Sequence, residues 1–158
     1  RRAGDGDWYY EQVELGFNYR MTDIQAALGI SQLGRLDGFI DSRQRLASLY
    51  DEKLKVMPVI LPSRNQFGRS ALHLYPIQCQ DSVVRKTLFD YLRTEGVGVN
   101  VHYIPVHTQP DYVPLVPEDT HCPNSIAYYE RAISLPMFPT LLEAEQNRVV
   151  ELIKRVIS

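Results

Sequence analysis

The sequence predicts an α+β fold of two layers, in which a small sheet is packed with helices. Three observations lead to it: a long helical pattern that begins at Thr22, a strand–helix–strand pattern over residues 71–101, and an amphipathic helix near the C-terminal end. The chain has 158 residues, of which 44% are hydrophobic, and this is enough to bury one core. We therefore expect one globular domain.

Composition excludes several classes of function. Lys and Arg number 17 against 19 Asp and Glu, so the charge balance does not favour nucleic acid or an anionic membrane as a partner. No stretch is apolar for long enough to predict a membrane span. The two cysteines, Cys79 and Cys122, are too few for a secreted disulfide scaffold, and a reducing cytoplasm is the expected location.

The N-terminal residues suggest that the chain is a piece of a longer protein. It begins Arg1-Arg2-Ala3, without an initiator methionine or a signal-peptide pattern. Residues 1–7 have the composition of a loop, and Trp8–Leu15 predicts a short strand that Gly16 ends.

The first helical pattern opens with a capping box, in which the Thr22 hydroxyl accepts from an orphan N–H and Gln25 reaches back. Apolar residues follow at helical spacing as far as Leu54, and Pro58 ends the run. Each glycine weakens a helix by up to about 1 kcal/mol. We therefore expect two helices, or one helix bent near Gly34–Gly38.

A loop over Val59–Gly68 leads to a predicted strand at Ala71–Gln78, where Pro76 indicates a strand end or an edge. Its alternation puts two leucines, Leu72 and Leu74, on one face and His73 and Tyr75 on the other.

Asp81 or Ser82 can cap the next helix, and Gly96 fits the position just past its end. Val97, Val99 and Val101 then alternate with small or polar residues, the pattern of a half-buried strand.

The C-terminal third starts irregular and becomes helical. Residues 102–123 are proline-rich and predict no regular element, whereas Asn124–Ala132 predicts a short helix and Ser134–Pro136 an extended piece. Thr140 and Glu143 form a second capping-box pattern, which predicts the start of the last helix. The apolar stripe of that helix consists of Val149, Leu152, Ile153 and Val156.

Two segments have residue types suited to binding. Gly16–Met21 offers the amide of Asn18, the guanidinium of Arg20 and the positive end of a helix, which suits a phosphate or a carboxylate. The alternative is that these side chains only order a turn.

The second segment, His102–His107, follows a predicted strand and brings two histidines and Tyr103 into one loop, where binding residues are common. Zinc binding is disfavoured because the available ligands fit no structural-zinc spacing: His102, His107, His121 and Cys122. Ordinary packing or capping by the histidines is the other alternative.

Lysines are few, and none stands where a Schiff base would form. All lie on, or at the ends of, the polar sides of predicted helices: Lys53, Lys55, Lys86 and Lys154. A Schiff-base lysine normally needs a desolvated or cationic pocket that lowers its pKa.

Taken together, Gly16–Gly29 (GFNYRMTDIQAALG), Gln32-Leu33, Arg43 and Tyr50 resemble a block of the DegT/DnrJ/EryC1/StrS family of pyridoxal-phosphate-dependent nucleotide-sugar aminotransferases. His102–His107 (HYIPVH) and Ser134–Phe138 (SLPMF) resemble two later blocks in the same order, so the resemblance covers nearly the whole chain. Within the family, the lead-in and the HYIPVH form look most like transaminases of pseudaminic acid biosynthesis.

The resemblance implies the small C-terminal domain of a fold-type I aminotransferase at residues 22–158, with residues 1–21 as a lead-in from a large cofactor domain. The family's Schiff-base lysine would lie upstream, so this chain holds no catalytic residue of its own and is expected to be inactive alone. By similarity, Asn18 and Arg20 contact the phosphate of pyridoxal 5'-phosphate across a homodimer. The resemblance also implies that three residues contact the nucleotide-sugar: His102, Tyr103 and His107.

The implied reaction moves an amino group from glutamate to a UDP-linked 4-keto-6-deoxy amino sugar. Neither nucleic acid nor a membrane is expected as a partner. Two other hypotheses remain. The chain could be a stand-alone nucleotide-sugar-binding or dimerisation module without catalysis. It could also be a structural fragment, which predicts an exposed apolar patch where a large domain would pack.

Overall fold

The computed structural model describes residues 14–17, 19–64, 68–117 and 121–157. Its chain divides into two compact units, residues 1–35 and 36–158. The predicted strand Trp8–Leu15 lies outside the described residues except for its last two, Glu14 and Leu15, which are irregular.

In the described part of the first unit lies helix α1 (Asp23–Leu33), and the capping box predicted for its start is confirmed. Gln25 N donates to Thr22 Oγ1 at 3.3 Å, and Thr22 N donates to Gln25 Oε1 at 2.9 Å. The helix ends at Gly34, whose N–H donates to Ile30 O at 3.2 Å. None of the residues of α1 is buried, although the helix is rich in apolar side chains.

The second unit begins with α2 (Leu36–Leu54), so two separate helices form, as one of the two sequence-based alternatives proposed. Four residues of α2 face the core and are wholly buried: Leu46, Ala47, Tyr50 and Leu54. Their spacing is that of one helical face.

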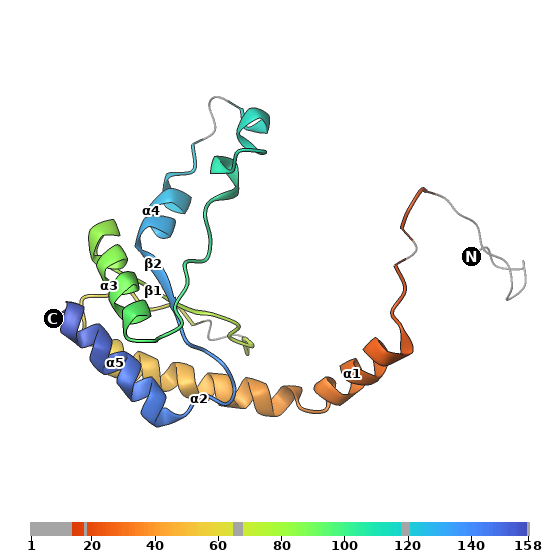
Figure 1. Cartoon of the computed structure of the whole chain (residues 1–158), viewed down its shortest axis with the longest axis horizontal. Coiled ribbons are helices and arrows are strands. Elements are labelled where there is room, and N and C mark those ends of the chain that lie inside the picture. The colour runs from red at the N-terminus through yellow and green to blue at the C-terminus, as the bar shows by residue number, and fades with distance from the viewer. Residues whose placement is uncertain (1–13, 18, 65–67, 118–120, 158) are drawn as a thin grey trace, which may run out of the picture. The chain divides into compact units, whose positions relative to one another are not determined.

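The sheet has two antiparallel strands, β1 (Tyr75–Gln78) and β2 (Ala132–Leu135), far apart in the sequence (Figure 1). Tyr75 pairs with Leu135 and Ile77 with Ile133. An isolated bridge joins Ile60 to Gln78 on the outer side of β1.

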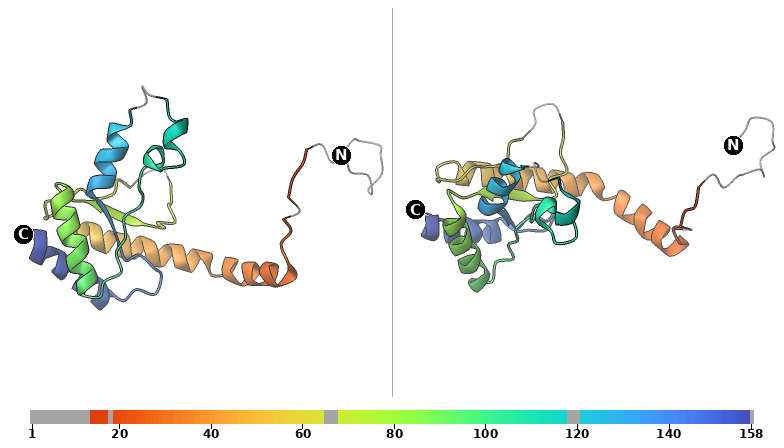
Figure 2. Two further views of the ribbon diagram at one scale, coloured as in Figure 1. Left: turned by 45° about the horizontal axis from the view of Figure 1, so that its top comes forward. Right: turned by 90° about the horizontal axis from the view of Figure 1, so that it is seen from above.

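The described residues of the second unit form further α-helices: α3 (Ser82–Thr94), α4 (Pro123–Arg131) and α5 (Glu143–Ile157). α5 lies beside α2 and α3, and α3 also contacts α4 and β2 (Figures 1 and 2). The buried apolar faces of these elements meet in one continuous core under the sheet. The α+β class, a small sheet packed with helices, is therefore confirmed.

The start and end of α3 match the sequence patterns. Asp81 is the N-cap, and its Oδ1 accepts from Val84 N at 2.8 Å, so Ser82 is the first helical residue instead. Gly96 follows the last turn with φ +77°, a left-handed conformation that glycine adopts without a steric penalty.

The prediction of a strand over Val97–Val101 was wrong, because no regular strand forms there. Val97 and Val99 are buried as expected, but only Asn100 pairs, in an isolated bridge to Ser134. Gly98, which has no side chain to pack, weakens strand formation between the two valines.

The predicted strand Ala71–Gln78 is shorter than expected, and Arg43 of α2 explains why. Its Nη1 donates to Leu72 O at 3.1 Å, His73 O at 3.2 Å and Met137 O at 2.7 Å. Leu72 also has φ +49°, which no strand residue adopts. The buried alternation therefore starts only at Tyr75 and continues with Ile77.

The last helix starts later than predicted. Thr140 is not its cap, because residues 138–141 form a hydrogen-bonded turn in which Leu141 N donates to Phe138 O at 3.0 Å. The bond from a glutamate side chain back to the backbone, which the capping box predicted for Glu143, is made by Glu145 instead. Its Oε2 accepts from Leu142 N at 2.9 Å. Val149, Leu152 and Ile153 are buried as predicted.

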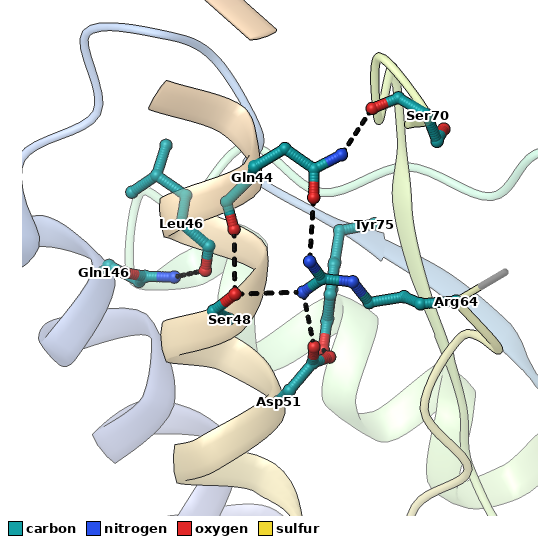
Figure 3. Close-up of polar contacts among 8 residues, drawn as sticks. All are labelled: Gln44, Leu46, Ser48, Asp51, Arg64, Ser70, Tyr75 and Gln146. Carbon is teal, nitrogen blue, oxygen red and sulfur yellow. Dashed lines mark hydrogen bonds and ion pairs between the residues drawn. The ribbon is translucent and has the colours of Figure 1, made fainter. Parts of the chain in front are cut away.

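A cluster of polar side chains links α2 to the loop that follows Ile60 (Figure 3). Arg64 donates from Nη1 to Asp51 Oδ2 at 2.7 Å and from Nη2 to Gln44 Oε1 at 2.8 Å. Asp51 Oδ1 accepts from the Tyr75 hydroxyl at 2.6 Å. One carboxylate thus joins the loop, the strand and the helix.

Candidate functional site

His102 lies at the rim of a hollow of about 310 Å³ in the second unit. The hollow lies where the extended residues after α3 pass β2 and the turn that follows it. Polar groups on its wall come from His73, Asn100, His102 and Ser134, and its apolar wall includes Pro136 and Met137. The arrangement offers imidazole and amide groups beside an apolar surface, which suits a small oxygen-rich ligand.

The hydroxyl of Ser134 contacts the ring of His102. The Ser134 Oγ lies 2.9 Å from His102 Nδ1, and Ser134 is only 5% exposed. The Tyr103 ring meets the His102 ring edge to face, with centroids 4.6 Å apart and planes at 73°. The imidazole therefore has a partner on one nitrogen and an aromatic neighbour on its flank.

The structure brings two of the three predicted substrate residues together. His102 and Tyr103 touch, and Tyr103 is 68% exposed. His107 lies further along the loop in a short 3₁₀ turn, η1 (Val106–Thr108), and is not among the residues that line the hollow.

The predicted cofactor residues belong to the first unit. Asn18 lies outside the described residues. Arg20 lines an open hollow of about 650 Å³ with Tyr19, Met21 and Gln25, close to the start of α1. The capping box uses the N–H groups of Thr22 and Gln25, so the guanidinium of Arg20 is the stronger donor for an anion there.

None of the four lysines lies in a desolvated pocket. Lys53 pairs with Asn147 and lies 3.6 Å from Glu143, Lys86 pairs with Asp90, and Lys154 with Glu151. Lys55 is exposed at the end of α2. Their described partners are those of surface lysines rather than of a Schiff-base site.

Cys79 fits an inert role. Burial raises the pKa of the Cys79 thiol to about 11, so the reactive thiolate is scarce at neutral pH. Across the described residues, no three His, Cys, Asp or Glu side chains gather in a way that could hold a metal ion. Nor does any helix in that part of the chain combine the length and apolar character needed to cross a bilayer.

Sequence patterns alone did not single out Ser134, Asn100 or His73 as parts of a site. Ser134 did carry a signal, because it is the one hydroxyl in the apolar run Ala132–Met137. A polar side chain in a buried strand has to be hydrogen-bonded, and its partner can be sought among nearby loops. Asn100 and His73 gave no such signal.

Comparison with known proteins gives the family. The model of the DegT/DnrJ/EryC1/StrS aminotransferase family matches residues 1–154. The spore coat polysaccharide biosynthesis protein SpsC of Bacillus subtilis is 34% identical over 99% of this chain and 42% of its own length. A UDP-4-amino-4,6-dideoxy-N-acetyl-beta-L-altrosamine transaminase of Campylobacter jejuni is 35% identical over 82% of this chain and 35% of its own length.

Solved structures agree. A DegT DnrJ EryC1 StrS aminotransferase from Brucella abortus has a TM-score of 0.83 and 33% identity over 96% of this chain and 40% of that one. The sugar aminotransferase Spr1654 of Streptococcus pneumoniae, solved in PMP and PLP forms, has TM-scores of 0.85 and 0.83 at 28% and 26% identity, over 94% and 96% of this chain and 38% and 40% of those chains. Helicobacter pylori PseC, an aminotransferase in pseudoaminic acid biosynthesis, has a TM-score of 0.83 at 25% identity, over 96% of this chain and 42% of that one. The present chain thus spans about two fifths of these relatives, and it belongs to the DegT/DnrJ/EryC1/StrS aminotransferase family.

Proposed function

We propose that this chain is the C-terminal part of a pyridoxal-phosphate-dependent aminotransferase that acts on a nucleotide-linked keto-sugar. The observation that carries the proposal is the family match over residues 1–154. The chain covers 42% of the Bacillus relative, and from the resemblance of its sequence blocks to the family's C-terminal part we place the rest of the enzyme upstream of residue 1. In this scheme residues 1–21 are the lead-in and residues 22–158 the small domain.

For the substrate we propose a UDP-linked 4-keto-6-deoxy amino sugar, with glutamate as the amino donor. Support comes from the Campylobacter relative, which is a transaminase of a UDP-linked 4-amino-4,6-dideoxy sugar. The 4-amino group of such a sugar corresponds to a 4-keto group in the amino acceptor. The hollow beside His102 adds physical support, because a sugar nucleotide is rich in oxygen acceptors and imidazole N–H groups can donate to them. His107 and Tyr103, on the same loop, are the further contacts we propose.

Pyridoxal phosphate, when bound, supplies the electron sink of the reaction. Of the residues in this chain, Arg20 and Asn18 would hold its phosphate, from across a homodimer interface. The planar guanidinium of Arg20 has the donor geometry that phosphate takes. The lysine surroundings fit no covalent anchor, so we expect the anchor in the upstream part and no activity from the isolated chain.

The proposal is tested with the complete gene product. It is assayed for 2-oxoglutarate release from glutamate in the presence of UDP-linked keto-sugars, and His107→Ala is compared with His121→Ala. We expect His107→Ala to raise the KM for the sugar by about tenfold, in line with the loss of a polar contact worth about 1.4 kcal/mol. His121→Ala should leave both constants unchanged. No amino transfer to any nucleotide-linked keto-sugar would contradict the proposal.

A stand-alone binding module is the second candidate. The observation that favours it is that the second unit has its own core and contains the whole hollow beside His102. This candidate predicts that the 158-residue chain binds a UDP-sugar without pyridoxal phosphate in isothermal titration. Absence of binding by the chain, together with turnover by the complete gene product, would favour the enzyme.

A further inference from the structure

Backbone pairing fixes the position of Ser134 beside the hollow. Its backbone N–H donates to Asn100 O at 2.8 Å, and the sheet register pairs it with Pro76 of β1. It therefore lies in β2 with extended chain on both sides, and its side chain is 5% exposed. A hydroxyl whose position is fixed in this way can orient the side chain that it hydrogen-bonds.

The direction of the bond between Ser134 and His102 follows from the needs of the hydroxyl. A buried O–H that finds no acceptor costs about 1–3 kcal/mol. Within the described part of the chain, His102 Nδ1 at 2.9 Å is the one acceptor in hydrogen-bond range of that O–H. With the hydroxyl as the donor of this bond, Nδ1 is the nitrogen that accepts.

An imidazole whose Nδ1 accepts a hydrogen bond carries its proton on Nε2. We infer that Ser134 is a positioning residue, which holds neutral His102 as the Nε2–H tautomer, so that the ring offers a donor to a ligand in the hollow. The Tyr103 ring at 4.6 Å restricts the same imidazole from its flank. His102 then recognises an oxygen acceptor rather than a donor.

The class of ligand rests on the proposed function. A sugar nucleotide presents acceptors in its diphosphate, its hydroxyl groups and its keto oxygen. An amide N–H or an ammonium group is a donor, and it would meet the Nε2–H without any attraction. Ser134 thereby selects which part of the substrate can face His102.

The tautomer is measured directly by NMR on the whole chain labelled with ¹⁵N-histidine. The chain has only four histidines, and the His102 signals are assigned by their loss in His102→Gln. Two-bond ¹H–¹⁵N correlation spectra distinguish a protonated ring nitrogen from an unprotonated one. We expect Nε2 protonated and Nδ1 unprotonated at a pH where the ring is neutral. The opposite tautomer in the unmodified chain would overturn the inference.

Two pairs of variants separate the hydroxyl from packing. Ser134→Ala removes the hydroxyl, and the His102 signals should move to the averaged values of a tautomer mixture. Ser134→Thr and Ser134→Val have almost the same shape, so any cost of the extra methyl group in β2 is common to both. The tautomer should persist in Ser134→Thr and be lost in Ser134→Val. Equal spectra for these two variants would contradict a positioning role.

Kinetics on the complete gene product test the ligand. The side-chain N–H₂ of Gln can take the place of Nε2, whereas that of Asn takes the place of Nδ1. We expect His102→Asn and Ser134→Ala to raise the sugar KM about five- to tenfold, the loss of one hydrogen bond, with a smaller rise in His102→Gln and kcat nearly unchanged. An unchanged KM beside the expected tautomer would refute the ligand assignment. Absence of turnover in the unmodified enzyme would refute the proposed function alone.

Discussion

Single side chains decide where the regular structure of this chain starts and stops. Arg43 donates from one guanidinium nitrogen to three carbonyl oxygens, two before β1 and one after β2. Those carbonyls would otherwise need a strand neighbour or water. Because Arg43 satisfies them, the chain can leave the sheet on both sides while remaining close to α2.

Replacing Arg43 should therefore cost more than a surface charge does. Arg43→Met keeps the aliphatic stem but leaves these carbonyls without their donor, and we expect the free energy of unfolding to fall by about 2–3 kcal/mol. Arg45→Met changes an exposed arginine on the same helix and should shift it by no more than about 0.5 kcal/mol. Urea titration of the two variants makes the comparison. Equal losses would show that Arg43 acts only as a surface charge.

Buried acids that stay protonated make stability depend on alkaline pH. Burial raises the pKa of the Cys79 thiol to about 11. Burial, and then the hydrogen bond to Asp51, raises the pKa of the Tyr75 phenol well above its usual range. The folded chain keeps these protons after the unfolded chain has lost them. The stabilisation is thus complete below the unfolded values, near 9.0 for Cys79 and 10.0 for Tyr75, and declines above them.

We predict a free energy of unfolding that begins to fall near pH 9 and steepens above pH 10. Each group contributes a slope of about 1.4 kcal/mol per pH unit between its unfolded and folded pKa. Tyr75→Phe removes one such group, so its loss above pH 10 should be shallower, although it is less stable at pH 7. Urea titrations from pH 7 to pH 11 provide the test. Parallel pH profiles for the two proteins would contradict it.

At the scale of elements, the cap of α3 gives a discriminating pair of variants. Asp81 accepts from Val84 N at 2.8 Å, and Ser82 is the first helical residue. Asp81→Ala should cost about 1 kcal/mol of stability, the usual worth of an N-cap. Ser82→Ala should be close to neutral, since alanine is favoured inside helices. Thermal unfolding of both variants measures the two losses of stability. A larger loss in Ser82→Ala would show that Ser82, and not Asp81, is the N-cap.

Local patterns predicted most of the elements, because their causes are local. The capping box at Thr22, the glycine after α3 and the apolar stripe of α5 each depend on residues within one or two turns. The two-helix alternative for residues 23–54 is likewise a consequence of local glycines.

The predictions failed where the start or the pairing of an element depends on residues far away in the sequence. The late start of β1 depends on Arg43, about 30 residues away in the sequence. Val97–Val101 alternates like a strand, yet only Asn100 finds a partner in Ser134. Thr140 and Glu143 have the spacing of a capping box, but Phe138–Leu141 forms a turn there, and the bond that forms runs from Leu142 N to Glu145 Oε2. In the candidate site, the loop His102–His107 carried a sequence signal, whereas the pairing of His102 with Ser134 is a tertiary contact.

At the scale of the whole molecule, each unit exposes apolar side chains that a folded protein usually covers. In α1, Ile24 is 83% exposed and Leu28 62%. In the second unit, the loop after Asn100 exposes Tyr103, Val106 and Leu115 by more than half. Surfaces of this kind mark contacts with other protein surfaces, and the upstream part proposed above, with its homodimer partner, would cover them.

The isolated chain should therefore self-associate. We expect sedimentation velocity to show concentration-dependent oligomers, and the double variant Ile24→Gln, Leu28→Gln to shift them toward monomer. Ser31→Gln, an exposed polar position on the same helix, is the control and should change nothing. A chain that stays monomeric at every concentration would show that these side chains do not drive association.

Under the proposed function, this chain completes an enzyme whose covalent anchor lies outside it. The most direct measurement is the DNA sequence upstream of the Arg1 codon. We expect an open reading frame that adds a domain-sized segment, with a lysine for the cofactor and an aspartate for its pyridine nitrogen. A stop codon followed by a start codon immediately before Arg1 would contradict the claim. The chain would then be a free-standing module, and nucleotide-sugar binding would be its function to test.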